Sequence, residues 1–250
     1  MFSGCSTTNF NLIDKISLTQ EDELSQEDDD LFDEFEEEAE IKDVSDPLES
    51  YNRAMTTFND TLIINVLIPV SNGYKTVVHK EIRESVSNFF HNLSYPPRVV
   101  NNLLQGKFKN SVEETQRFII NTTVGIVGLF DPAKTYFDLK PHKEDLGQTL
   151  GFYGVGSGPH IVIPLLGPSN LRDITGIYTD SYLSLTDYTD REWLTLTDEW
   201  AEYTAIKAYE KINEFSIDNQ NYMKLKEDAI DLYPYLRDIY EQHRDKQIKE

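Results

Sequence analysis

The residues that could do chemistry are few and widely spaced. The five histidines stand at positions 79, 91, 142, 160 and 243, and none forms an H-x-x-x-H or H-x₂-C pair. The single cysteine, Cys5, excludes an intramolecular disulfide and a four-thiolate zinc site. The chain has neither a G-x-S-x-G nucleophile elbow nor an H-E-x-x-H motif. The sequence therefore predicts no catalytic centre, no metal site and no cofactor.

A glycine-rich run, GVGSGP at 154–159, is the next feature that could hold a ligand. It lacks the G-x-G-x-x-G spacing of a phosphate cradle, and Pro159 removes a backbone N–H that such a cradle would use. We interpret the run as a flexible or tightly turned loop, with phosphate binding as the alternative.

Three arginines lie within otherwise apolar helical patterns, namely Arg117, Arg172 and Arg237. An arginine in such a position pairs with a carboxylate inside the fold or contacts a lipid phosphate. The residues alone favour pairing.

Cys5 follows Ser3-Gly4 and precedes a run of Ser and Thr, as in a bacterial lipobox, where the thiol is acylated. Phe2 stands where leucine is usual, and four residues before Cys5 are too few for a secretory signal. We therefore expect a start upstream of Met1 or a trimmed chain. The alternative is a free thiol in a disordered tail.

The charge is concentrated near the N-terminus. The whole chain of 250 residues carries a net charge of −21, and residues 1–43 hold fifteen of its acids against two lysines. Such a segment cannot bury a core, so we expect a disordered acidic tether over 1–45 and one folded domain over 46–250. Clustered Lys and Arg are absent, which excludes nucleic acid as a partner.

Apolar residues recur at helical spacing in the folded part. The pattern predicts helices at about 46–67, 80–92, 97–104, 108–123, near 169–173, and at about 195–215, 219–229 and 234–248. Asp46 is expected to cap the first helix and Pro69 to bend or end it. Residues 124–168 read as irregular and glycine-rich, and only 160–163 reads as extended. The predicted class is all-α.

Two apolar segments, 62–70 and 118–130, are shorter than the roughly 20 residues that cross a bilayer. Segments of this length are core helices or helices lying in a membrane interface. Periodicity alone favours the core.

Six ordered blocks resemble one known family. They read DPLESYNRAM at 46–55, SNFFHNL at 87–93, VNNLLQGK at 100–107, RFIINTTVG at 117–125, GQTLG to GVG at 147–156, and LLGPS with LRD at 165–173. The resemblance is to the MlaA (VacJ) outer-membrane lipoproteins. It covers about 46–180 and returns in YLRDIY at 235–240.

The resemblance implies a ring of amphipathic helices in the inner leaflet of the outer membrane of a Gram-negative bacterium. It implies removal of phospholipid from the outer leaflet, transfer to a periplasmic carrier of the Mla type, and lipidation of Cys5. It leaves open a porin as a further partner. It also reverses the preference for core at 58–70 and 118–130. The residues we expect to face lipid or a channel are Phe58, Asn59, Leu62, Ile63, Phe118, Asn121, Val124 and Ile126.

The glycine-rich run could then serve as a gate or hinge, with Gly151, Gly154, Gly156 and Gly158 as its candidates. Two other functions compete with transport. One is a docking lipoprotein that holds envelope proteins and moves no lipid. The other is a lipid-modifying enzyme, which the missing nucleophile disfavours.

Overall fold

The computed structural model describes residues 46–184, 200–218 and 220–250. The chain divides into two units, Met1–Asp43 and Val44–Glu250, and all described residues belong to the second. The predicted acidic tether and Cys5 lie outside the described residues, so both remain expectations.

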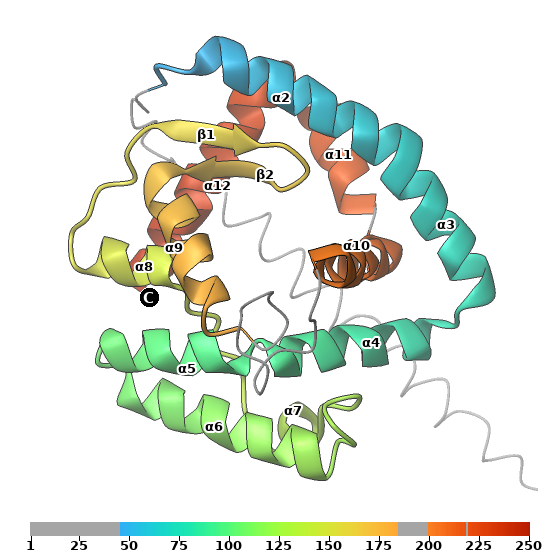
Figure 1. Ribbon diagram of the computed structural model, residues 1–250, viewed down its shortest axis with the longest axis vertical. Helices are drawn as coiled ribbons and strands as arrows, with labels where there is room; N and C mark the ends of the chain where they lie inside the picture. Colours follow the sequence, from blue (N-terminus) through green and yellow to red (C-terminus); the bar gives the residue numbers. More distant parts are fainter. Residues whose placement is uncertain (1–45, 185–199, 219) are drawn as a thin grey trace, which may run out of the picture. The chain divides into compact units, whose positions relative to one another are not determined.

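The second unit is mostly helical, which confirms the predicted class (Figure 1). One antiparallel hairpin accompanies the helices, with His160 opposite Asn170 and Ile163 opposite Gly167. In chain order the elements are α2 Glu49–Leu62, η2 Ile63–Leu67, α3 Ile68–Val77, α4 Lys80–Leu93, α5 Tyr95–Leu104, α6 Phe108–Thr123, α7 Pro132–Phe137, α8 Leu146–Phe152, β1 His160–Ile163, β2 Gly167–Asn170, α9 Leu171–Ser181, α10 Trp200–Ile217, α11 Gln220–Asp228 and α12 Leu232–Lys249.

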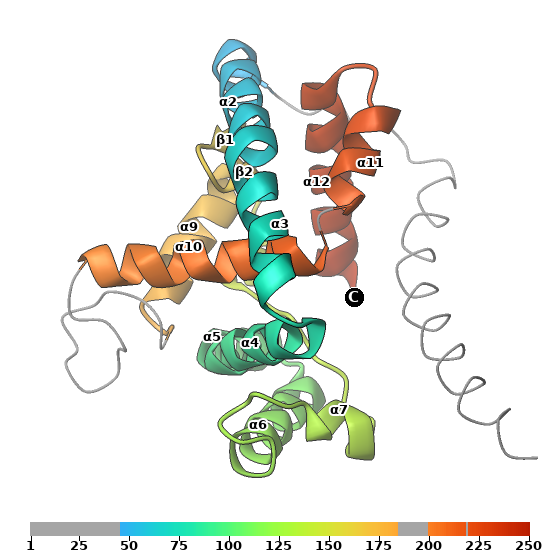
Figure 2. The same ribbon diagram turned by 90° about the vertical axis from the view of Figure 1, so that its right-hand side faces the viewer.

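Helices distant in sequence pack together within this unit. Helix α10 packs against α3 and α4, and Figure 2 shows it running across α3. Helix α12 packs against α8, α2 and β2, while α8 lies against α9 and α5. Between α8 and α9 the backbones approach so closely that a Cβ on Gly176 would lie 2.5 Å from the amide nitrogen of Gly147. Glycine at this crossing is therefore a packing requirement.

The predicted start of the first helix was wrong, and of the two outcomes predicted for Pro69, a bend or an end, the end was wrong. Helix α2 starts at Glu49, and Asp46 instead accepts hydrogen bonds from Asn52 and Tyr233. Pro69 does not end the helix, because the π-helical turn η2 precedes it and α3 continues to Val77. Proline is tolerated near the start of a helical segment, where its missing N–H leaves no bond unmade.

The middle of the chain was also only partly predicted. Residues 160–163 are extended, as expected, but 124–168 also contain α7 and α8. Both helices are short, and each begins at an aspartate whose side chain caps it: Asp131 accepts from the amide of Lys134, and Asp145 from that of Gln148. Their periodicity extends over too few residues to stand out from the surrounding glycines.

Two asparagines of α2 hold the hairpin by binding its backbone. The Asn52 amide donates to the carbonyl of His160 at 3.0 Å, and its oxygen accepts from the amide of Val162 at 2.9 Å. Asn59, two helical turns further on, donates to the carbonyl of Ile163 at 3.0 Å. Both side chains are buried. They supply to one edge of β1 the donor and acceptor that a neighbouring strand would supply.

A buried arginine joins three helices. Arg244 on α12 binds Asp173 on α9 at 2.9 Å and Asp145, the N-cap of α8, at 2.8 Å. Tyr240 donates to the same Asp173 carboxylate at 2.6 Å. The Asp173 side chain is 3% exposed, so its charge depends on these partners. The cluster fixes the C-terminal helix to the N-terminal ends of α8 and α9.

We predict that Arg244→Gln lowers the free energy of unfolding by about 3 kcal/mol, because it leaves the Asp173 carboxylate buried with weaker compensation. Arg53→Gln is a matched control, since Arg53 also binds two carboxylates, those of Glu49 and Asp231, but is exposed. We expect that control to lose much less stability, because both of its ion pairs are exposed to solvent. Denaturant unfolding in mild detergent measures both, and equal losses would contradict the assignment.

The same cluster predicts a pH dependence. Burial raises the pKa of Asp173, but hydrogen bonds from Arg244 and Tyr240 outweigh it and hold that pKa below its usual value. The stabilisation is therefore complete above the unfolded-state pKa near 3.8 and disappears as the pH falls through the lower folded-state value. We expect the wild-type protein to lose stability below about pH 4. Arg244→Gln should show a weaker dependence in that range.

Candidate functional site

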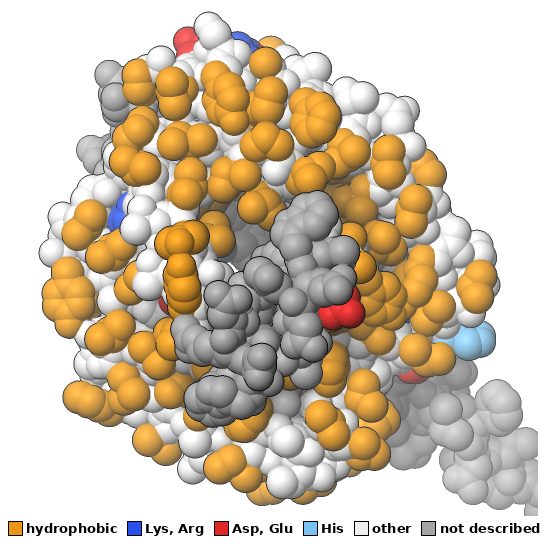
Figure 3. All heavy atoms as spheres, viewed as in Figure 1, with side chains coloured by type: hydrophobic (Ala, Val, Ile, Leu, Met, Phe, Trp, Pro, Cys, Tyr) orange, Lys and Arg blue, Asp and Glu red, His pale blue; other side chains and the backbone are white. Residues whose placement is uncertain are grey.

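The polarity of this unit is the reverse of that in a water-soluble domain. Among the described residues, the buried apolar side chains are Phe90, Ala133, Val162 and Tyr233, whereas most buried side chains are polar. Large apolar side chains are exposed on many of the helices and loops. Figure 3 shows them across the visible face, with few charged groups among them. Exposed apolar surface on this scale marks contact with a membrane or another protein.

Helix α6 shows how the reversal is built. Phe108, Val112 and Ile119 form the apolar stripe predicted from the sequence, and each is more than half exposed. The opposite face carries Glu114 and Arg117, which are buried. In water such a helix would turn its apolar stripe inward. The outward stripe is expected of a helix whose neighbour is lipid.

Several buried charges of the described residues are paired with one of opposite sign. Arg98 on α5 binds Glu114 at 2.8 Å, and Arg117 binds Asp131 at 2.7 Å. Arg172 binds Asp173 at 3.1 Å. Carboxylate pairing, the interpretation that the sequence favoured for Arg117 and Arg172, is therefore confirmed. Arg237 likewise binds Asp238 at 2.8 Å. Such pairs let charged helices pack together without a large apolar core.

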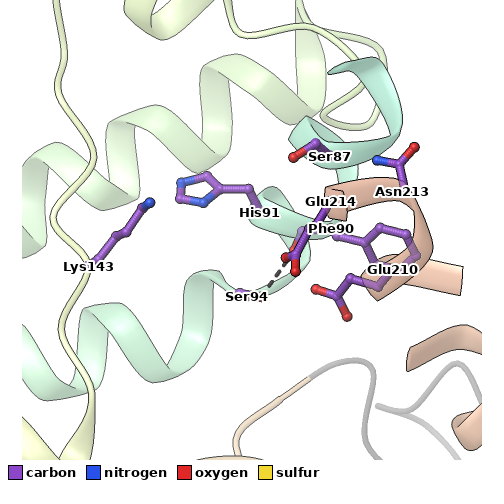
Figure 4. Close-up of a pocket in the computed structure, with 8 residues that line it drawn as sticks. All are labelled: Ser87, Phe90, His91, Ser94, Lys143, Glu210, Asn213 and Glu214. Atoms are coloured by element: carbon purple, nitrogen blue, oxygen red, sulfur yellow. Dashed lines mark hydrogen bonds between the residues drawn. The ribbon is translucent and has the colours of Figure 1, made fainter. Parts of the chain in front are cut away.

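A polar cavity of about 210 Å³ lies between α4 and α10. Helix α4 contributes Ser87, Phe90 and His91, the residue after it is Ser94, and α10 contributes Glu210, Asn213 and Glu214. Lys143, from the segment between α7 and α8, completes the lining. In Figure 4 the His91 ring and the Lys143 ammonium point toward one another, with the α10 side chains on the other side. The cavity thus has a cationic and an anionic side.

His91 is the most perturbed group in this cavity. Burial, with the nearby positive charges of Arg98 and Lys143, lowers its pKa to about 3. The ring is therefore neutral at physiological pH. Its Nε2 atom is buried and has no hydrogen-bond partner among the described residues. A neutral imidazole nitrogen of this kind can bind one polar atom of a ligand.

The predicted lipid-facing residues of α2 and η2 fall in two environments. Phe58 is 47% exposed, and Leu62 and Ile63 are partly exposed. Asn59 is buried and holds β1, as described above. Phe58, Leu62 and Ile63 are thus accessible for contact with lipid, whereas the Asn59 amide already binds the backbone of β1.

The predicted residues of the second apolar segment, 118–130, also include exposed and buried ones. Val124 and Ile126 are 66% and 59% exposed. Phe118 is partly exposed and stacks on Tyr95 with ring centroids 4.3 Å apart. Asn121 is buried, donates to Asp131 at 2.9 Å and accepts from the amide of Ala133. No part of the structure tests the channel role of these residues, which remains a prediction.

The four candidate hinge glycines also differ. Gly151 lies in α8, where a Cβ would be 2.5 Å from the Ile248 side chain. Gly154 and Gly158 have positive φ angles of 84° and 70°, which favour glycine, and Gly156 has open space around it. The run is therefore a tightly turned loop, as the sequence indicated, and its motion is untested.

Sequence reasoning missed the cavity residues. His91 belongs to a recognised block but was assigned no role, and Lys143 and Glu210 belong to none. These residues line one cavity although they lie far apart in the sequence, and periodicity does not reveal such a juxtaposition. No helix in the described ranges is long and apolar enough to cross a bilayer. The same ranges contain no group of His, Cys, Asp or Glu arranged to hold a metal.

Several characterised and sequenced proteins resemble this chain. It is 36% identical to the intermembrane phospholipid transport system lipoprotein MlaA of Escherichia coli over 60% of this chain and 59% of that protein. It is 30% identical to the Haemophilus influenzae protein of the same name over 81% of this chain and 79% of that protein. A Rickettsia bellii protein is 32% identical over 83% of this chain and 78% of its own length.

A solved structure and a family model agree with these relatives. The structure, described as the "Structural basis for maintenance of bacterial outer membrane lipid asymmetry", has a TM-score of 0.68 and 31% sequence identity. The match covers 82% of this chain and 99% of that one. The family model described as MlaA lipoprotein matches residues 44–247. The resemblance seen in the six sequence blocks is thereby confirmed, and the chain belongs to the MlaA lipoprotein family.

Proposed function

We propose that this protein removes phospholipid from the outer leaflet of the outer membrane and passes it to a periplasmic carrier, thereby maintaining lipid asymmetry. The observation that supports the proposal most strongly is the reversed polarity of the fold. Exposed side chains such as Phe108, Val124 and Val77 offer a surface for acyl chains. Polar side chains line the cavity between α4 and α10, where a headgroup could be accommodated. A phospholipid needs both environments at once.

The relatives support the lipid as cargo. The Escherichia coli and Haemophilus influenzae proteins are named as lipoproteins of intermembrane phospholipid transport systems. By analogy, Cys5 would carry the lipid anchor and the body would lie on the periplasmic side of the outer membrane. Helices that lie in one leaflet need only bury their apolar faces by about 5–10 Å, which amphipathic helices such as α6 can achieve. The partners we propose are the outer membrane, a soluble Mla-type carrier and, as a further candidate, a porin.

The competing function is a docking lipoprotein that moves no lipid. A docking lipoprotein and a transporter would both place the protein in the membrane. They differ in whether lipid passes through the protein. Transport changes no covalent bond, so this proposal needs no nucleophile or cofactor. The discriminating observation is therefore lipid movement rather than product formation.

The test uses asymmetric vesicles with fluorescent phospholipid only in the leaflet that faces away from an added lipid-free carrier. With the full-length protein reconstituted, we expect the carrier to acquire the label faster than from protein-free vesicles. A carrier that binds the vesicles but acquires no label would support docking and contradict transport.

A second prediction concerns the hinge. Because alanine at a positive φ costs about 1–2 kcal/mol, Gly154→Ala should strain the loop and lower lipid flux in the vesicle assay. Gly73→Ala on α3 adds the same methyl group outside the glycine-rich run, where nothing lies within 4 Å, and serves as the control. Flux is compared at equal amounts of reconstituted protein. Unchanged flux in Gly154→Ala would remove the loop from the mechanism.

A further inference from the structure

The cavity between α4 and α10 carries charges of both signs, which bears on the kind of lipid it would accept. Lys143 stands on one side and forms no ion pair with any described residue. Glu210 and Glu214 stand on the other side (Figure 4). A wholly anionic ligand would meet two carboxylates, while a simple cation would meet the lysine. A ligand with separated positive and negative charges meets a favourable partner at each end.

The size of the cavity limits how much of a lipid it can hold. Its volume of about 210 Å³ is below the roughly 300–1,000 Å³ of pockets that enclose a drug-sized ligand. It is therefore too small for acyl chains and suits a polar headgroup. The exposed apolar side chains elsewhere on the unit would have to accommodate the chains.

The existing partners of the carboxylates are weak competitors. Glu210 binds Lys207 at 3.1 Å and Glu214 binds Lys211 at 2.8 Å, in both cases three residues away on α10. Pairs of this spacing on a partly exposed helix stabilise it only slightly. A ligand ammonium could therefore share either carboxylate. Glu210, with a side chain only 18% exposed, is the more shielded of the two.

Resting on the transport function proposed above, we propose that this cavity binds the headgroup of a zwitterionic phospholipid bearing a primary amine. Lys143 faces the phosphate, on the side of the cavity where the His91 ring lies. Glu210, with Glu214, faces the ammonium. A primary ammonium donates hydrogen bonds to carboxylates, which distinguishes such a lipid from phosphatidylglycerol.

Native mass spectrometry of the full-length protein tests this after exchange with an equimolar mixture of phosphatidylethanolamine and phosphatidylglycerol of identical acyl chains. We expect the wild-type protein to retain more phosphatidylethanolamine. Glu210→Gln should reduce that preference about five-fold, as expected for one partly solvated ion pair. Lys143→Gln should instead lower the occupancy of both lipids, because both carry the phosphate.

Two exposed residues provide matched controls. Glu227→Gln on α11 and Lys140→Gln, three residues before Lys143, make the same charge changes outside the cavity. Both should behave like the wild-type protein. Retention of both lipids equally by the wild-type protein, or an equal shift in Glu227→Gln, would overturn headgroup recognition and leave transport intact. A protein that retains no phospholipid and fails the vesicle assay would overturn both proposals.

Discussion

The fold depends on hydrogen bonds and ion pairs that satisfy the buried polar side chains, while apolar side chains face outward. Where a helix contacts lipid, burial of its apolar side chains against another helix brings little gain, and association rests on packing and interhelical hydrogen bonds. This chain uses asparagine and arginine for that purpose. Asn52 binds the β1 backbone, Arg98 binds Glu114, and Arg244 joins α12 to α8 and α9. Each contact links elements that share almost no apolar core.

This arrangement has a functional consequence. Because helices here are joined by polar side chains, a cavity lined by charged and amide groups can form between two of them without a large cost in buried apolar surface. The cavity between α4 and α10 is of this kind. The outer surface, in contrast, provides the apolar environment that acyl chains require. A helical unit with these two surfaces can contact both parts of a phospholipid although none of its described helices crosses a bilayer.

The sequence predicted the local structure well and the tertiary contacts poorly. The range of α6 and the extended segment at 160–163 follow from spacing alone. Periodicity identifies the apolar stripe of α6 but does not show whether that stripe contacts a protein core or lipid. The family resemblance indicated contact with lipid. Asn59 and Asn121 were assigned to lipid because they stand in apolar segments, yet their partners lie in β1 and near α7. The Arg244–Asp173 pair joins residues 71 positions apart, which no local pattern reveals.

The central claim is that the exposed apolar side chains contact lipid acyl chains. It can be measured directly with phospholipids that carry a photoreactive diazirine near the end of one acyl chain. The full-length protein is reconstituted in bilayers, irradiated and mapped by peptide mass spectrometry. We predict crosslinks at exposed positions such as Val77, Ile119 and Val124, and none at the buried Glu114. Absence of crosslinks at those exposed positions in membrane-bound protein would contradict the account.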